Sequence, residues 1–398
     1  MSKLSIPPAP RSPTRARVAR SLFERAVHGL ERLEVIAPDG RALRAQPGAP
    51  RMEIVSDAFF HRLAASGKIG FGEAYMAEEW RSDDLAGVLS AFATRLTSLV
   101  PRPIQHLRRL YEPLQPGHER NTPEGARANI SRHYDLSNEL FATFLDETMT
   151  YSCAIFAPGD TLERAQQRKY QAMCDLVDLR SGDHMLEIGT GWGGMAMHAA
   201  ATSGCRVTTI TISQRQKQLA EQRIRQAGLD GQIEVLLCDY RDVRRRFDKI
   251  VSIEMFEAVG EEYWSEFFGI CDRLLAPGGR MSLQTITMPH GRFRATRRSY
   301  TWVHKYIFPG GLIPSEPAIA DALSEASQLR IASSNEIGQH YAPTLRLWRE
   351  RFLDRWDEVR GLGFDDTFRR TWEFYLAYCE AGFRTGAIGD AQMAIQRP

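Results

Sequence analysis

The sequence predicts an α/β fold with a doubly wound, mostly parallel sheet, because short apolar strands alternate with amphipathic helices from about residue 129 to residue 288. Two further observations support this prediction. The glycine-rich segment 189–194 follows an apolar run and opens a helix of small residues. Polar or acidic residues follow each of the next three predicted strands, at the sheet edge where such folds bind ligands.

The glycine-rich segment predicts a cofactor site. Glycine tolerates positive φ and lets backbone N–H groups come close to a bound ligand. A strand, a glycine loop and a helix in this order commonly bind a nucleotide-like cofactor. Gly189, Gly191 and Gly194 also satisfy the G-x-G-x-x-G dinucleotide pattern, which by itself has little specificity.

The residues after the next strands distinguish between cofactors. A dinucleotide site places an acidic residue at the end of the second strand, to bind the ribose. Here the second strand, predicted over 206–212, runs into 213–216 without a carboxylate. The third, 233–238, ends at Asp239 and Tyr240, which suit an adenine edge and its stacking partner, and the fourth, 247–253, ends at Glu254. This order favours S-adenosylmethionine, and a NAD-linked oxidoreductase remains the alternative.

The length of 398 residues predicts two domains, because single cores rarely exceed about 250–300 residues. Residues 1–15 are expected to be a disordered tail, and 16–115 a small, mostly helical domain with helical patterns at 22–30, 59–65, 73–80 and 85–99. Residues 116–128 are expected to be a linker. The α/β domain follows over 129–398, with aromatic-rich helical segments at 292–325 and 345–378 and a last strand at 386–396.

The charge is unevenly distributed, although the net charge is only +2. Residues 1–20 and 280–315 carry lysine and arginine but no acidic residue. Such runs are usually solvated faces, and the functional alternative is attraction to the phosphates of lipid headgroups or nucleic acid. No apolar run approaches the ~20 residues of a membrane span, and the N-terminus lacks the apolar core of a signal peptide. The 6 cysteines form no C-x-x-C pair, which argues against a zinc site or a disulfide framework and for a reducing cytoplasm.

Several segments carry motifs in a fixed order. They are 131–138, 149–153, 187–194, 211–216, 255–260, 306–311 and 375–384. Together they resemble the cyclopropane-fatty-acyl-phospholipid synthase family, which includes the mycolic acid cyclopropane synthases, nearly end to end over 129–398. The resemblance implies a class I (Rossmann-like) methyltransferase fold with helical insertions. Residues 1–115 resemble only loosely the small N-terminal domain of phospholipid-acting members, which implies a lipid-binding role.

The resemblance also implies a reaction. A methyl group passes from S-adenosylmethionine to the cis double bond of an unsaturated phospholipid acyl chain and creates a carbocation. A base then removes a proton from the new methyl group, and a cyclopropane ring closes. Such a site must exclude water and profits from aromatic faces, each worth roughly 0.5–2 kcal/mol to a cation. The aromatic insertions fit this demand, although Trp302, Tyr306, Phe308 and Trp348 are individually more typical of core.

The resemblance assigns residues to two sites. A bicarbonate ion is implied as the proton acceptor, at positions that match Cys153, Glu257, Gln284, the backbone of Ile286, and Tyr341. The positions that match cofactor contacts are Tyr134, Tyr151, Ser152, Gly189, Gly191, Thr211, Gln216, Asp239, Tyr240 and Ile253. Gln216 is expected to bond the ribose hydroxyls. Taken alone, Glu257 is equally typical of a helix cap, Cys153 of a buried apolar residue, and Tyr341, Thr211 and Ile253 of core packing.

Two positions depart from the family pattern. Many members have histidine where this chain has Gln284, and histidine after the motif glutamate where it has Ala258. Glutamine hydrogen-bonds an anion but takes up no proton near neutral pH. The departure keeps open a methyl- or methylene-branched product, formed when a neighbouring carbon of the chain loses the proton instead.

Other functions remain open on the sequence alone. A methyltransferase acting on RNA or a small polar metabolite is disfavoured, because no Asn/Asp-Pro-Pro-aromatic motif is present. A lipid-binding protein with a relic cofactor site is compatible with Gln284 and Ala258. The favoured reading has an unsaturated phospholipid as partner, no nucleic acid and no metal. It has the protein at the inner face of the membrane, held there peripherally, and a homodimer is compatible with it.

Overall fold

The computed structural model describes residues 6–94 and 137–398. The predicted linker, the end of the predicted first domain and the candidate cofactor residue Tyr134 lie outside these residues. The chain forms two compact units. We call Met1–Leu114, Ser299–Ile307 and Trp348–Ala387 the N-terminal unit, and Gln115–Arg298, Phe308–Leu347 and Ile388–Pro398 the sheet unit.

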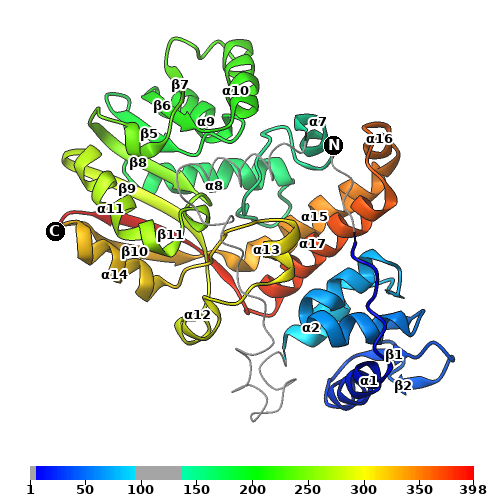
Figure 1. Cartoon of the computed structure of the whole chain (residues 1–398). Helices are drawn as coiled ribbons and strands as arrows, with labels where there is room; N and C mark the ends of the chain where they lie inside the picture. Colours follow the sequence, from blue (N-terminus) through cyan, green and yellow to red (C-terminus); the bar gives the residue numbers. More distant parts are fainter. Residues whose placement is uncertain (1–5, 95–136) are drawn as a thin grey trace. The chain divides into compact units, whose positions relative to one another are not determined.

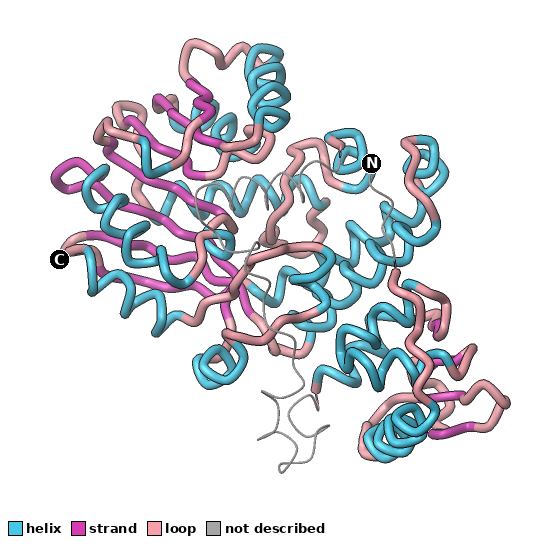
Figure 2. Tube along the Cα trace, viewed as in Figure 1, coloured by secondary structure: helices cyan, strands magenta, loops and turns pink. Residues whose placement is uncertain are grey.

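The sheet unit is built on a seven-stranded sheet in the order β10-β11-β9-β8-β5-β6-β7 (Figures 1 and 2). The strands from β5 to β9 are parallel, and β11 runs antiparallel to both of its neighbours. Their bounds are β5 His184–Ile188, β6 Arg206–Thr211, β7 Ile233–Leu237, β8 Phe247–Ile253, β9 Leu275–Thr287, β10 Arg330–Glu336 and β11 Gly389–Gln396. The predicted α/β fold class is therefore confirmed.

Helices cover both faces of this sheet, with one apolar core on each side. On one face lie α8 (Leu162–Leu176), α9 (Gly194–Ser203) and α10 (Gln214–Gln226), and on the other α11 (Trp264–Leu274) and α14 (Glu316–Ala326). Successive strand residues point to opposite faces, so Met185 belongs to the first core and Leu186 to the second. This alternation fixes the strand register and places the strand ends at one edge.

Strand β10 was not predicted from the sequence. All but one of its seven residues are exposed, and its sequence, RIASSNE, has no apolar alternation. Among the described strands it lies at the edge of the sheet, next to β11. An edge strand that buries neither face carries no periodic signal, which explains the omission.

The N-terminal unit contains α1 (Pro13–His28), α2 (Ala58–Met76) and α3 (Leu85–Ala93), so α1 begins inside the segment expected to be a disordered tail. It also contains a four-stranded sheet that the sequence did not predict, in the order β2-β1-β3-β4. Its strands are β1 Glu34–Ile36, β2 Ala42–Arg44, β3 Arg51–Ile54 and β4 Trp80–Arg81. Strands of two to four residues are too short for alternation to be recognised.

The aromatic helices α13 (Trp302–Tyr306), α16 (Trp356–Gly361) and α17 (Asp366–Arg384) also belong to this unit, although they were expected in the 129–398 domain. The rings of Trp302 and Phe374 lie 4.7 Å apart, and a Cβ at Gly72 would stand 2.5 Å from the Trp302 indole. The Tyr306 hydroxyl donates to Glu73 at 2.7 Å. Sequence order alone does not show which core such helices join. Trp302 and Trp348 are both buried, which confirms their reading as core residues.

Candidate active site

The glycine loop between β5 and α9 requires its glycines for conformational reasons. Gly189, Gly191 and Gly193 have φ values of 103°, 51° and 86°, in the left-handed region that L side chains avoid. The backbone N–H groups of Gly189 and Thr190 both donate to the Ile210 carbonyl at 3.1 Å, which fastens the loop to β6. The loop is thus a fixed, side-chain-poor surface at the carboxyl end of the parallel strands, as the sequence predicted.

Gln216, in the first turn of α10 after β6, and Asp239, just after β7, are both held in fixed orientations. The Thr211 hydroxyl donates to Gln216 Oε1 at 2.8 Å, so strand β6 orients this amide directly. Asp239 follows β7, and its carboxylate forms an ion pair of 2.7 Å with Arg241. The Tyr240 ring packs edge-on against Phe267, with centroids 5.2 Å apart. The candidate cofactor residues after β5, β6 and β7 therefore lie at one edge of the sheet.

Tyr151 and Ser152 precede α8. Tyr151 packs edge-on against Phe141 of α7 (Asn138–Phe144), with centroids 5.2 Å apart. The Ser152 hydroxyl accepts a hydrogen bond of 2.7 Å from Lys169 Nζ, so this side chain is already engaged. Lys169 is wholly buried, and its burial lowers its pKa to about 8. Sequence reasoning missed Lys169, although its place on the apolar face of α8, four residues from both Ala165 and Met173, was an available signal.

The carboxylate of Glu254 lies at the centre of the second group of candidate residues. Glu254 directly follows β8, and its Oε1 accepts from the Cys153 backbone N–H at 2.8 Å and from Gln284 Nε2 at 2.9 Å. Its Oε2 accepts from the Tyr341 hydroxyl at 2.6 Å. Three of the predicted catalytic residues thus converge on one carboxylate, which sequence reasoning had noted only as a strand end.

The backbone at Glu254 is strained. Its φ of 46° lies in the left-handed region, which costs a residue with a Cβ roughly 1–2 kcal/mol. Such outliers persist where the surroundings determine them, and they are concentrated at functional sites. Here the three hydrogen bonds to the carboxylate and a fourth from the Glu254 backbone N–H to the Gln284 carbonyl, at 2.8 Å, hold the residue in place.

Gln284 and Asp390 lie next to Glu254 on the adjacent strands β9 and β11. Gln284 is fully buried, and its Oε1 accepts from Gln392 Nε2 at 2.9 Å, which fixes the amide so that Nε2 faces Glu254. Asp390 is also fully buried, with its Oδ2 3.3 Å from the same Nε2. Burial, and next the negative charge of Glu254, raise the pKa of Asp390 well above its usual range and favour its neutral form.

Glu257 lies one turn further along, in the short helix η3 (Phe256–Ala258). The backbone N–H of Ile286 donates to its Oε1, while its Oε2 is buried without a hydrogen-bond partner among the described residues. Burial, and next the charge of Glu254, raise the pKa of Glu257 to about 8. We call Glu254, Glu257 and Asp390 the acidic cluster.

The thiol of Cys153 does not act as a nucleophile in this arrangement. It is fully buried, and burial, followed by the charges of Asp390 and Glu254, raises its pKa. The thiol lies 3.3 Å from the Ala154 carbonyl and 3.7 Å from the Ile337 carbonyl, and the backbone N–H of the residue donates to Glu254. A thiolate is the reactive form of cysteine, so this environment is unreactive.

The donors assigned to bicarbonate are therefore all bonded to carboxylates of the protein. Glu254 takes the Cys153 N–H, the Gln284 amide and the Tyr341 hydroxyl, and Glu257 takes the Ile286 N–H. A bicarbonate ion would have to displace a carboxylate from the same donors and would carry like charge beside it. The residues present do not fit a bound bicarbonate ion.

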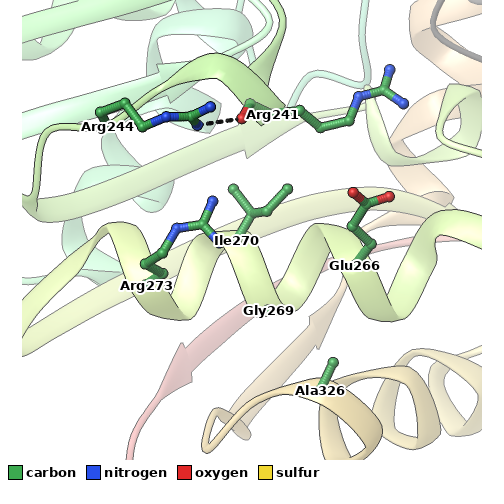
Figure 3. Close-up of a pocket in the computed structure, with 7 residues that line it drawn as sticks. All are labelled: Arg241, Arg244, Glu266, Gly269, Ile270, Arg273 and Ala326. Carbon is green, nitrogen blue, oxygen red and sulfur yellow. Dashed lines mark hydrogen bonds between the residues drawn. The ribbon is translucent and has the colours of Figure 1, made fainter.

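A separate surface pocket of about 590 Å³ lies along α11. Figure 3 shows Arg244 and Arg273 approaching it from facing elements, with Arg244 donating to the Arg241 carbonyl at 2.6 Å. No residue predicted for either site lines this pocket. Among the described residues, no three histidine, cysteine or acidic side chains are grouped so that they could hold a metal ion. Within the same residues, no helix has the length and apolar character needed to cross a bilayer.

Comparisons with known proteins show the family to which the chain belongs. The sequence model of the family described as mycolic acid cyclopropane synthetase matches residues 121–393. The chain is 46% identical to the tuberculostearic acid methyltransferase of Mycobacterium tuberculosis over 402 residues, which cover 98% of this chain and 94% of that protein. It is 34% identical to the cyclopropane-fatty-acyl-phospholipid synthase of Escherichia coli K12 over 367 residues, covering 92% of each.

Solved structures of the same family have a similar fold. The cyclopropane synthase MmaA2 from Mycobacterium tuberculosis superposes with a TM-score of 0.63 at 29% identity, covering 68% of this chain and 97% of that chain. A mycolic acid cyclopropane synthase crystallised with SAH and CTAB also has a TM-score of 0.63, at 31% identity, covering 71% of this chain and 99% of that chain. The chain belongs to the mycolic acid cyclopropane synthetase family and is an S-adenosylmethionine-dependent methyltransferase of the cyclopropane-fatty-acyl-phospholipid synthase type.

Proposed function

We propose that this protein transfers a methyl group from S-adenosylmethionine to the cis double bond of an unsaturated acyl chain in a membrane phospholipid. The observation that carries the proposal is the hydrogen-bonded carboxylate of Glu254 at the end of β8, on the same edge of the sheet as the glycine loop. Methyl transfer to an alkene needs an electrophilic methyl donor and a nearby proton acceptor, and this edge supplies a place for both.

The reaction balances without a further reactant. The bond between sulfur and the methyl carbon breaks, and the electron pair of the alkene forms the new C–C bond, which leaves a cation on the adjacent carbon. Loss of one C–H proton then supplies the pair that closes a ring or forms a C=C bond. The products are S-adenosylhomocysteine, the altered acyl chain and one proton.

A branched acyl chain is the product we favour. The identity of 46% to a tuberculostearic acid methyltransferase, over nearly the whole chain, supports a branched product, either methylene-branched or methyl-branched with a C=C bond retained in the chain. The cyclopropane ring is the second candidate, supported by 34% identity to the Escherichia coli synthase. Both products arise from one cation. A ring forms when the new methyl group loses the proton, and a branch forms when a neighbouring carbon of the chain loses it.

The test is to incubate the purified protein with S-adenosylmethionine and vesicles of an unsaturated phospholipid, then release and identify the fatty acids by mass spectrometry. We expect acyl chains heavier by one carbon, and fragmentation distinguishes a ring from a branch. Unchanged chains across lipids and salt concentrations would rule out the proposed substrate. Methylation of RNA or of small metabolites in parallel reactions would support the alternative.

We also propose that the protein binds the inner face of the membrane peripherally, and that residues 16–115 contribute to this binding. The basic segments 1–20 and 280–315 support the proposal, since each cation near an anionic surface contributes about 1 kcal/mol. Sedimentation with anionic vesicles should fall steeply as salt rises, while neutral vesicles should bind little. Binding that is indifferent to salt would contradict an electrostatic attachment.

A further inference from the structure

The carboxylate of Glu254 has the hydrogen-bond donors that the family resemblance assigns to a bound bicarbonate ion. The Cys153 N–H, the Gln284 amide and the Tyr341 hydroxyl lie 2.6–2.9 Å from the oxygens of Glu254. Hydrogen bonds from donors fixed by a scaffold hold an anion in one orientation. These three donors come from residues far apart in the sequence, and Glu254 is an acceptor that they share.

The surrounding charge also disfavours a second anion. Asp390 and Glu257 lie within the acidic cluster, and the negative charge of Glu254 is among the causes that raise both of their pKa values. The buried cation facing the cluster is Lys169, whose charge interacts with both Glu254 and Asp390. One buried ammonium balances the charge of one carboxylate, so a further anion beside Glu254 would lack a compensating charge.

We propose that Glu254 replaces bicarbonate in this protein: its carboxylate occupies the place of the ion and takes the proton from the methylated acyl chain, so that turnover needs no bicarbonate. This inference rests on the proposed function, because it assigns the proton acceptor of that reaction.

The proton transfer follows simple chemistry. A C–H bond next to the cation breaks, its electron pair forms the ring bond or the double bond, and the proton passes to a carboxylate oxygen of Glu254. A proton beside a carbocation is far more acidic than a carboxylic acid, so even a carboxylate stabilised by three donors is basic enough. Glu254 is partly exposed, and it returns the proton to water after the product leaves.

The strained backbone of Glu254 provides a sharp test. With φ at 46°, glycine is the substitution that this position accommodates without strain, and Glu254→Gly also removes the carboxylate. It frees the three donors and leaves space where an added anion can bind. Glu254→Gln is the matched control, because it keeps the side-chain volume, fills the same space and cannot accept the proton.

The experiment measures turnover of unsaturated phospholipid in bicarbonate-free buffer under argon and again with 20–50 mM bicarbonate, about the range needed to fill a weak anion site. We expect wild-type turnover to be unchanged by bicarbonate. Both variants should lose on the order of 100-fold or more in kcat, within the range for removal of a general base. Bicarbonate should restore at least tenfold to Glu254→Gly and nothing to Glu254→Gln.

Two results would overturn the inference alone: wild-type turnover that falls when bicarbonate is removed, or Glu254→Gln retaining most of its kcat. Absence of wild-type turnover with and without bicarbonate would instead refute the proposed function, and this inference with it. A second readout needs no turnover. Carbon-13 NMR of labelled bicarbonate should show no binding to wild type and binding to Glu254→Gly, with S-adenosylmethionine affinity confirming that each variant is folded; binding to wild type would contradict the proposal.

Discussion

The glycine loop and the acidic cluster lie at the same edge of one sheet but are built in opposite ways. The loop depends on backbone conformation, with three residues at positive φ within five positions of the sequence. The acidic cluster depends on charged side chains that follow β8 or lie in η3 and β11, and on donors to Glu254 from β9, α15 (Tyr341–Asp354) and the segment before α8. The first can be recognised in a short stretch of sequence, whereas the second exists only after the chain has folded.

The two regions are sensitive to different changes, the loop to substitution of its glycines and the acidic cluster to pH. A Cβ at the left-handed positions of the loop would strain its backbone, but the loop carries no net charge, so pH should hardly affect it. The acidic cluster has three carboxyl groups, two of which interact with the buried ammonium of Lys169, and the charge of Glu254 affects the pKa of the other two. The two regions should therefore respond differently to substitution and to pH.

The largest effect is expected from Glu257→Gln, as a change in how stability depends on pH. The pKa of Glu257 is about 8 in the folded protein and about 4.5 when unfolded, so between these pH values only the folded state holds the proton. Wild-type stability should thus fall as pH rises through this window, by up to about 1.4 kcal/mol per pH unit. Glutamine does not ionise. The free energy of unfolding of the variant should therefore rise relative to that of wild type by about 3–5 kcal/mol between pH 4.5 and pH 8.

Urea unfolding of wild type and variant at several pH values measures this gain. Glu147→Gln, at an exposed position outside the acidic cluster, is the control for removal of a carboxylate. Parallel curves for wild type and Glu257→Gln would show that Glu257 is ionised in the folded protein at neutral pH.

The next largest effect is expected in the glycine loop. Gly191→Val places a β-branched side chain at φ of 51°, and the loop must change its conformation to relieve the strain. Affinity for S-adenosylmethionine, measured by calorimetry, should fall on the order of 100-fold, equivalent to about 2.7 kcal/mol. Gly182→Ala is the matched control, because a Cβ there meets no atom within 4 Å. Equal affinity of both variants for S-adenosylmethionine would show that the loop does not contribute to cofactor binding.

Tyr341→Phe should have a smaller effect, confined to the acidic cluster. It removes the 2.6 Å hydrogen bond to Glu254 Oε2, and a bond to a charged acceptor is worth about 1.5–3 kcal/mol. We expect kcat to fall roughly 10- to 100-fold, with the affinity for S-adenosylmethionine unchanged. Tyr378→Phe, at a partly exposed ring, is the control. A loss of cofactor affinity equal to the loss of kcat would mean that Tyr341 serves the cofactor and not Glu254.

The smallest effect is expected from Ser213→Ala. The Ser213 hydroxyl accepts from the Gln216 backbone N–H at 3.3 Å and caps α10, and loss of such a cap costs about 1 kcal/mol. The free energy of unfolding should drop by about that amount, with only a few-fold loss of cofactor affinity. A loss as large as that of Gly191→Val would mean that this end of β6 also depends on backbone conformation.

The sequence predicted the parallel sheet and the glycine loop because each has a local signal, whereas the candidate catalytic residues came from the family resemblance. It did not predict Lys169, whose charge is typical of a solvated face until α8 is packed against β9 and β11. It did not predict the role of Glu254, because a carboxylate after a strand has many functions and its three donors lie 30 to 101 residues away. Burial and convergence are properties of the fold, so these assignments needed the structure.

The most direct test of the central claim is a crystal structure of the protein with S-adenosylhomocysteine, grown in the presence of bicarbonate. We predict that the Glu254 carboxylate accepts from the Cys153 N–H, the Gln284 amide and the Tyr341 hydroxyl, with no ion among them. A planar anion bonded to these donors, with Glu254 turned away, would contradict it.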